Sequence, residues 1–501
     1  MNSKYFISGT CAESQKYLAV EVNLIHMAGH TTIRDITAIA VAKASVQVDP
    51  DVYESIRIAA ERAALLGRRV PTYGRSTGVG ANRLVVVSAG DSEHGLRLLR
   101  SHSTDAGAPI PPKVVRAMLA VRLAQLCVPG SGIRVEVLDG LSRMLNDDAL
   151  PSVLESGTIG TGDLAALAGT ALTLMGERPA SRSLEAMSPW GSENALPFMS
   201  SSALTIGRAC LILDELKDLM HSMLAIYSLS FVALDANPSP FSHAAVVASV
   251  TPGMSEVAAR LRDLIGVPRS PGRIQDPFGL RAFPINFSGV WSAATRMREQ
   301  VASLLNVAQE NPLFVFDGDG GVVHHAGFYQ SALALATDGL SLALAQTGPI
   351  ALSRIRMMNE PDVTGKRAFL AEGPAGASGL LMLEYIAASA LVDMRQAAQP
   401  ASLNTVSLSR GTEEDATFAP RAVLQLEQSV AAFQVMLACE LVETTRLLRQ
   451  RGLSSAEMPT DLLAHVATVA FRLPDAVHDR SLRDDLQQAQ GLLPEIAVLS
   501  G

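Results

Sequence analysis

The longest regular pattern in this chain is a helical repeat of apolar side chains over 420–448. Apolar residues recur there at three- and four-residue steps, which is the spacing of one face of an α-helix. Pro420 suits the first turn of such a helix, and Gly452 suits its end. The apolar residues of this face are Val423, Leu426, Val430, Phe433, Leu437, Leu441 and Leu448. A helix of this length needs long partners to cover its apolar face, so the pattern predicts a helix bundle.

Four other segments show similar long apolar patterns, and the composition supports the same fold class. Those segments are 203–234, 286–309, 328–350 and 375–397. Hydrophobic residues make up 48% of the chain but aromatic residues only 5%, so the apolar mass is mostly Ala, Leu, Val and Met, a mixture that favours helices. Strand-like alternation occurs only in Arg83–Val87 and Leu313–Phe316. The sequence therefore predicts an all-α protein with a long central helix bundle.

Glycine-rich stretches separate the predicted helices and divide the 501 residues into three parts. We expect an N-terminal loop-rich helical region over 1–200, the central long-helix bundle over 201–450 and a C-terminal helical tail over 451–501. In a helical scaffold, such loops at the helix ends are where functional residues usually lie.

The charge and the apolar runs argue against several classes of partner. The formal net charge is −8, from 41 basic and 49 acidic residues, and no basic run offers a footprint for nucleic acid. The most apolar run, Leu219–Leu234, contains His221 and several serines and is shorter than a membrane span. We therefore expect a buried core helix there, and neither nucleic acid nor a membrane as a partner. The N-terminus shows no continuous apolar signal segment.

The cysteines and histidines show no metal-ligand spacing. Cys11, Cys127, Cys210 and Cys439 lie far apart, which indicates neither a disulfide framework nor a zinc site. The HxxxH spacing over 26–30 lacks the glutamate that a zinc-binding helix places after its first histidine. We therefore predict no metal, and a cytoplasmic protein with reduced, buried thiols.

Two glycine-rich loops carry candidate chemistry. The first, over 70–83, reads VPTYGRSTGVGANR, and its glycines lack the third member of a phosphate-binding loop. Tyr73 in this loop can serve as a general acid or base, or it is an ordinary loop tyrosine. The second loop places three glycines over 157–162 ahead of Asp163, which we expect to cap the apolar helix that follows.

Six motifs follow one another along the chain: YGxxTGxG, SH, RLxQLxxPGSGIR, GTIGTGDLAALA, QDPFGLR and ENPL. From about 24 to 448, this series resembles the histidine/phenylalanine ammonia-lyase family, whose members carry a methylidene-imidazolone (MIO) electrophile. The resemblance implies an all-helical fold and a homotetramer whose active sites combine loops from several subunits. Such an assembly would also account for the surplus of apolar residues.

The resemblance implies roles for three residues. Tyr73 matches the catalytic tyrosine that removes the β-proton of the substrate. His102, in the Ser-His motif, matches the histidine that lies beside the substrate in histidine lyases. Arg281 matches the arginine that binds the substrate carboxylate, a task that suits the planar, bidentate guanidinium.

The segment that matches the electrophile departs from the family pattern. The family has Ala-Ser-Gly before Asp-Leu, whereas this chain has Gly160, Thr161 and Gly162. Cyclisation requires the nitrogen of the third residue to attack the carbonyl of the first, after which dehydration of the middle residue supplies the alkene. Thr161 would give a more substituted alkene that hinders an incoming amine. We favour loss of the electrophile, and formation of MIO from this variant triad remains the alternative.

Further positions depart from the family pattern and are our remaining substrate-binding candidates. Met199 stands where an asparagine is expected, and Phe278 replaces a tyrosine, so that a hydroxyl is lost. His324 lies in the loop where the family has Asn-Phe-His. In the late Gln-Glu-Asp segment, local identity assigns Glu414 to the site and counting back from the following Thr-Phe pair assigns Arg410.

These observations predict a carbon–nitrogen, or carbon–heteroatom, lyase that acts on an amino acid or an amino-acid derivative. Tyr73 would act as the base and the reaction would run without MIO, so no cofactor is expected. Two alternatives stay open: an MIO-dependent His/Phe/Tyr ammonia-lyase or aminomutase with a variant triad, and a non-catalytic homologue that binds an amino-acid-like ligand.

Overall fold

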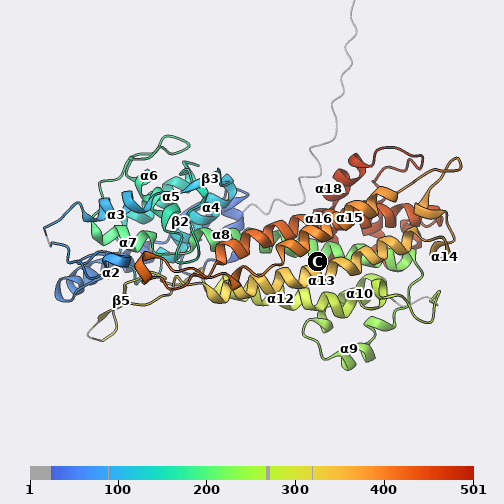
Figure 1. Ribbon diagram of the computed structural model, residues 1–501, viewed down its shortest axis with the longest axis horizontal. Helices are drawn as coiled ribbons and strands as arrows, with labels where there is room; N and C mark the ends of the chain where they lie inside the picture. Colours follow the sequence, from blue (N-terminus) through green and yellow to red (C-terminus); the bar gives the residue numbers. More distant parts are fainter. Residues whose placement is uncertain (1–23, 89, 267–270, 319) are drawn as a thin grey trace, which may run out of the picture.

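The computed structural model describes residues 24–88, 90–266, 271–318 and 320–501. Figure 1 shows an elongated molecule in which a lobe of short helices at one end continues into a bundle of long helices. The bundle is formed by α8 (Ala203–Ala233), α10 (Met254–Ile265), α12 (Phe283–Ser303), α13 (Ser331–Asn359), α15 (Leu381–Ala397), α16 (Ala419–Gln450), α17 (Asp461–Ala470) and α18 (Arg483–Ser500). The all-α fold class is confirmed.

The long helices confirm the apolar periodicity of the sequence. α16 packs along α13, α15 and α8, and α12 packs along α13. The apolar face of α16 that the sequence predicted is buried, with Val423, Leu426 and Phe433 all inaccessible to solvent. The C-terminal helix α18 packs against α8 and α16, so it forms part of the same core.

Among the described residues, the first seven helices and the first four strands lie in the lobe. The helices are α1 (Ile33–Ala40), α2 (Pro50–Arg69), α3 (His94–His102), α4 (Pro112–Leu126), α5 (Glu136–Asn146), α6 (Leu164–Leu174) and α7 (Ser192–Met199). The strands are β1 (Leu24–Met27), parallel to β2 (Ser45–Val48), and β3 (Ala106–Pro109), antiparallel to β4 (Leu154–Ser156). α8 packs against α4 and so ties the lobe to the bundle.

One of the two predicted strands is correct. Leu313–Phe316 corresponds to β5 (Leu313–Val315), which pairs antiparallel with β6 (Gly321–Val323) and lies at the lobe end in Figure 1. Arg83–Val87 is not a strand, because only Val86 forms a bridge, to Thr77. The apolar side chains of that segment are solvent-exposed, so they are not the buried face of a sheet.

Shorter elements connect the long helices: α9 (His243–Ser249), α11 (Phe278–Arg281) and α14 (Pro361–Thr364). Single 3₁₀ turns occur at Gly80–Asn82 (η1), Ser239–Phe241, Ala368–Leu370, Ala401–Leu403, Ser409–Gly411 (η5) and Ser455–Glu457. η1 and η5 lie against each other, although they are far apart in the sequence.

Two helical segments are long and apolar enough to cross a membrane by length and composition. In Ser192–Ala233 94% of the most apolar window is buried inside the molecule, and in Ala419–Gln450 61% is buried. Burial of this kind is what core helices of a bundle show. Cys127, Cys210 and Cys439 are buried free thiols, and Cys11 lies outside the described residues.

Candidate functional site

The Tyr73 loop leaves the end of α2 and folds back on itself. The backbone N–H of Gly80 donates to the Tyr73 hydroxyl at 2.7 Å, so the phenol is held by its own loop. The backbone N–H of Tyr73 donates to Nε2 of His324 at 3.3 Å. Gly74 has φ +74°, and a Cβ at this position would lie 2.1 Å from the Leu196 side chain. Glycine is therefore required immediately after the tyrosine.

The surroundings of Tyr73 control its acidity. Burial raises the pKa of the half-buried phenol, and the negative charge of Glu413 raises it further. The hydrogen bond from Gly80 and the positive charge of Arg83 act in the opposite direction. The phenol is therefore protonated at neutral pH in the isolated chain, and a cationic group next to Glu413 would favour its ionisation.

Arg75 fastens the same loop to the rest of the lobe. One guanidinium nitrogen donates to the carbonyl oxygens of Ser131 at 3.2 Å and Glu193 at 3.1 Å, with a weaker contact to Gly132 at 3.4 Å. The guanidinium also lies 4.5 Å from the ring centre of Phe314, in a cation–π arrangement. Burial lowers the pKa of Arg75 to about 10, so the side chain stays charged at neutral pH.

The triad loop precedes α6 and is held from two sides. Gly160 and Gly162 both have positive φ angles, +99° and +100°. Thr158 donates its hydroxyl to the carbonyl oxygen of Gly162 at 3.1 Å. On the other side, Thr417 donates its hydroxyl to the carbonyl oxygen of Gly160 at 3.1 Å. Between these two anchors, the half-buried Thr161 faces a cleft.

Asp163 does not cap α6 through its side chain, contrary to the sequence prediction. Its carboxylate instead accepts hydrogen bonds from the Thr158 hydroxyl at 2.9 Å and from the backbone N–H and hydroxyl of Thr205 at 2.8 and 3.1 Å. Full burial raises the pKa of this carboxyl, while these hydrogen bonds lower it. Asp163 therefore connects the triad loop to the start of α8.

The residues at the triad do not fit the MIO group in its usual Ala-Ser-Gly form. A Cβ built on Gly160 would lie 2.1 Å from the hydroxyl oxygen of Thr417 and 2.9 Å from the backbone nitrogen of Phe418. The methyl of an alanine therefore has no space at this position. The extra methyl of Thr161 would in addition sit on the alkene carbon that receives the amine.

A cleft of about 600 Å³ lies in front of the triad loop. Thr161 and Gly162 line one wall, and Leu408 and Glu413 line another. Leu408 and Glu413 form a tight backbone bridge, whose turn, η5, packs against η1 of the Tyr73 loop. Glu413 lines this cleft and its negative charge acts on Tyr73, whereas the Tyr73 side chain is not among the residues that line the cleft.

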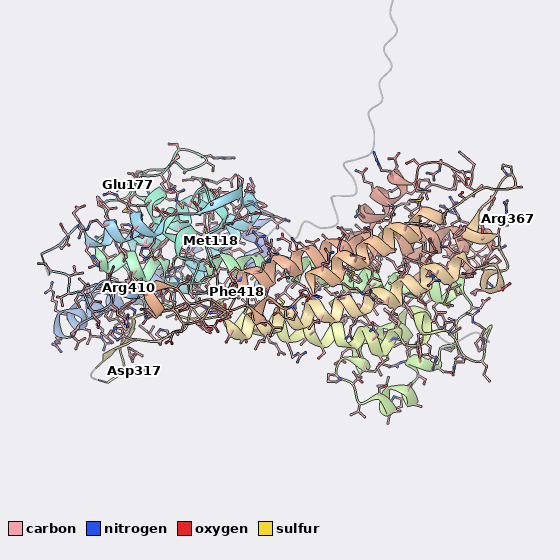
Figure 2. The ribbon with its side chains drawn as sticks, in the orientation of Figure 1. Met118, Glu177, Asp317, Arg367, Arg410 and Phe418 are labelled. Carbon is pink, nitrogen blue, oxygen red and sulfur yellow. The ribbon has the colours of Figure 1, made fainter. Side chains whose placement is uncertain are left out.

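The two candidates in the late segment lie on this same turn. Arg410 is exposed and has a positive φ of +56°, and Figure 2 shows it within the lobe, while Phe418 lies where α16 enters the bundle. Glu414 is exposed as well. Neither Arg410 nor Glu414 lines the cleft, whereas their neighbour Glu413 does.

The adjacent histidines at 324 and 325 face different partners. His324 accepts from the backbone of Tyr73, as described above. His325 bonds through Nε2 to the carbonyl oxygen of Glu310 at 2.6 Å, and its own backbone N–H donates to the Asn311 side chain at 3.0 Å. Glu310 in turn forms a fully buried ion pair with Arg122 at 2.8 Å. His324 thus contacts the Tyr73 loop, whereas His325 is bonded to the neighbouring 310–311 segment.

His102 and Met199 do not line the cleft in front of the triad loop. His102 ends α3, with Nδ1 bonded to the carbonyl oxygen of Leu98 at 2.8 Å, and it does not line the cleft. Met199 ends α7 and is fully buried in the core. A substrate-binding role for these two residues stays a prediction.

Arg281 and Phe278 lie far from Tyr73 within one chain. Both are on α11, where the Arg281 guanidinium lies 4.6 Å from the ring centre of Phe278. α11 is packed against α13, because Arg354 donates to the carbonyl oxygen of Gly279 at 2.9 Å. Figure 1 places β5 and α2, the helix that leads into the Tyr73 loop, at one end of the molecule and α14, which follows α13, at the other. Phe278 is 61% exposed.

Three residues of this site are not among the candidates to which the sequence assigned a role: Arg75, Glu413 and Thr417. Each acts through a contact with a segment remote in sequence, so no local pattern identifies it. Across the described residues, no group of three or more His, Cys, Asp or Glu side chains is placed to hold a metal ion.

The comparisons with known proteins identify the family of this chain. The sequence profile of the family described as aromatic amino acid lyase matches residues 31–468. A histidine ammonia-lyase from Deinococcus radiodurans is 30% identical over 480 residues, which cover 91% of this chain and 91% of that protein. A histidine ammonia-lyase from Symbiobacterium thermophilum is 31% identical over 490 residues, which cover 92% of this chain and 95% of that protein.

A solved structure with the same fold is an ergothionase from Treponema denticola in complex with desmethyl-ergothioneine sulfonic acid. It superposes with a TM-score of 0.86 at 20% identity, and the match covers 94% of this chain and 99% of that one. At this level of identity the likeness concerns the fold alone.

Proposed function

Because this chain belongs to the aromatic amino acid lyase family, and is therefore a lyase, we propose that it eliminates a nitrogen group from an amino acid or an amino-acid derivative by way of Tyr73, without MIO. The observation that carries this proposal is the pairing of two features in one lobe. The Tyr73 phenol is held by Gly80, and the adjoining triad loop has no space for the family's alanine at position 160.

In this reaction the ionised phenol of Tyr73 takes the proton from the β-carbon of the substrate. The electron pair of that C–H bond forms the α,β double bond, and the bond from the α-carbon to its leaving group breaks. The leaving group departs with the bonding pair, so atoms and charge balance. Without an electrophile to activate a primary amine, the substrate needs a better leaving group, such as a quaternary ammonium, or a more acidic β-proton.

The charges of the cleft fit a substrate of this kind. Glu155 and Glu413 line it together with Arg421, so that carboxylates outnumber cations in this part of the site. A cationic nitrogen beside Glu413 offsets the charge that raises the pKa of Tyr73. Substrate binding and activation of the base would then be coupled.

The carboxylate of the substrate needs a cationic partner, and Arg281, which the family resemblance matches to this role, lies on α11, away from the Tyr73 loop of its own chain. We assign this role to Arg281 of a second copy in a homotetramer located in the cytoplasm. Several large apolar side chains of α12, α13 and α15 are exposed in the single chain and are available for such contacts. These residues are Ile285, Leu335, Leu342, Met382, Tyr385 and Val392.

The test of the activity uses a panel of histidine, phenylalanine, tyrosine and their α-N-trimethyl derivatives. Product formation is followed by the ultraviolet absorbance of the conjugated acrylate and by assay of the released amine. We expect turnover of a trimethylated substrate, and its loss in Tyr73→Phe. Turnover that persists in Tyr73→Phe would refute the role of the base, and ligand binding without turnover of any panel member would favour the non-catalytic alternative.

The shared site is tested by mixing subunits. Tyr73→Phe and Arg281→Ala proteins should each be inactive, while co-expressed mixtures should recover activity because some sites then combine a native Tyr73 with a native Arg281. Mixed oligomers that form by mass and yet remain inactive would contradict the assignment of Arg281 to a neighbouring subunit.

A further inference from the structure

Thr417 lies between the cleft-lining turn and α16, and it contacts the triad loop directly. Its hydroxyl donates to the carbonyl oxygen of Gly160 at 3.1 Å and accepts from the backbone N–H of Ala419 at 3.2 Å. Next to it, the backbone N–H of Phe418 donates to the carbonyl oxygen of Ile159 at 2.9 Å. Thr417 is only 4% exposed, so these contacts are shielded from water.

Thr417 also occupies the space that a side chain at position 160 would need. The Cβ of any residue other than glycine would lie 2.1 Å from the Thr417 hydroxyl oxygen and 3.2 Å from the Thr417 Cβ. The φ of +99° at Gly160 adds backbone strain for any such residue. Glycine at 160 and threonine at 417 therefore form a complementary pair across the loop.

The peptide that follows is fixed from the opposite side. Thr158 holds the carbonyl oxygen of Gly162, and the backbone N–H of Asp163 donates to the carbonyl oxygen of Ser201 at 2.7 Å. Thr161 lies between these anchors and lines the cleft. The orientation of Thr161 thus depends on hydrogen bonds at both ends of the triad, of which Thr417 supplies one.

We propose that Thr417 is a positioning residue: its hydroxyl fixes the Gly160 peptide, so that Thr161 is presented to the cleft, and its side chain, together with the backbone nitrogen of Phe418, leaves no space for a Cβ at 160. The functional part of this inference rests on the elimination proposed above, while the structural part does not. Because the Thr417 hydroxyl also accepts from the first residue of α16, it links the start of that helix to the triad loop.

The test compares two substitutions that separate the hydroxyl from the shape of the side chain. Thr417→Val keeps the shape and removes the hydroxyl, whereas Thr417→Ser keeps the hydroxyl. Thr445→Val is the matched control, because it removes a buried hydroxyl from α16 that bonds only within that helix, to the Leu441 carbonyl oxygen. Hydrogen–deuterium exchange of the Asp163 and Phe418 amides, which donate to the carbonyl oxygens of Ser201 and Ile159, is measured together with the melting temperature.

We expect exchange of these amides to rise about tenfold in Thr417→Val, as local opening becomes easier. Thr417→Ser and Thr445→Val should leave exchange of the Asp163 and Phe418 amides near the native rate. Native-like protection in Thr417→Val, or equal loss in Thr417→Ser, would overturn the proposal. This measurement needs no substrate, so a failure of the proposed reaction and a failure of this inference are distinguishable.

The steric part is tested by a double-mutant cycle. Gly160→Ala alone should lower the melting temperature strongly, and Gly160→Ala combined with Thr417→Ala should lower it by less than the two separate effects together. Additive effects, or a Gly160→Ala protein that melts like the native one, would overturn the complementary pairing.

Discussion

Replacing Arg75 by methionine tests whether the Tyr73 loop depends on a buried cation. The change removes donation to the carbonyl oxygens of Ser131 and Glu193, as well as the cation–π contact with Phe314. Hydrogen bonds from a charged donor contribute about 1.5–3 kcal/mol each. The fall in the pKa of Arg75 to about 10 corresponds to a net cost of about 3 kcal/mol for holding the charge in this buried position, after the opposing effect of Glu193. The methionine side chain avoids that cost, so we expect a net loss of about 1–3 kcal/mol of stability.

The effect on catalysis should exceed the effect on stability. Loosening of the loop displaces the Tyr73 phenol, and displacements of about 1 Å can cost about 100-fold in rate. We therefore expect kcat for the substrate found in the panel to fall about 10- to 100-fold, with a smaller change in KM. Stability is followed by urea unfolding and the rate by the absorbance assay.

Arg57→Met is the matched control for this experiment, because Arg57 is an exposed arginine of α2 whose partners are the surface acids Glu54 and Glu61. Such surface pairs contribute about 0.3–0.5 kcal/mol, so the control should be near native in both assays. An Arg75→Met protein with native kcat, or one no less stable than Arg57→Met, would refute the reasoning.

Three further changes test other parts of the structure. Glu413→Gln removes a charge that raises the pKa of Tyr73, so the limb on which kcat rises with pH, which reports ionisation of the base, should shift to lower pH; a shift to higher pH would contradict this. Arg354→Met leaves Glu440 buried and unpaired and should cost about 3–5 kcal/mol in urea unfolding, whereas a loss below 1 kcal/mol would show that Glu440 finds another partner. Burial raises the pKa of Glu443 far above its ordinary value, so the folded state loses stability as pH rises above the pKa that this group has in the unfolded chain. Glu443→Gln should therefore raise Tm more at pH 8 than at pH 5. An equal change in Tm at both pH values would contradict the assigned burial cost.

The sequence predicts the long helices well because their apolar repeat reports burial directly. α16 begins at Ala419 and ends at Gln450, close to the range expected from its apolar face. Arg83–Val87 shows the limit of the same logic, because Leu84 and Val86 are 84% and 80% exposed on a loop surface. Apolar residues that are exposed on a loop can thus alternate in the sequence as the residues of a strand do, and the alternation alone does not distinguish the two.

The site was predictable only where a motif fixes a local conformation. Tyr73 and the glycine after it lie in one tight loop, so the motif identifies them together. The prediction that the Asp163 side chain caps α6 is wrong, because its carboxylate instead accepts from the backbone N–H of Thr205 in the first turn of α8. The contact of Thr417 with Gly160 spans 257 residues. Pairings of this kind arise from the packing of distant segments and leave no local signature.

The central claim is that this lyase operates with an open Gly160–Thr161–Gly162 segment. The most direct measurement is the mass of the peptide that contains these residues, obtained by proteolysis of the native protein, together with the intact mass of the chain. The account predicts the mass that the sequence gives, with Thr161 unmodified. A peptide lighter by two water molecules would contradict the account and would establish that the triad has cyclised.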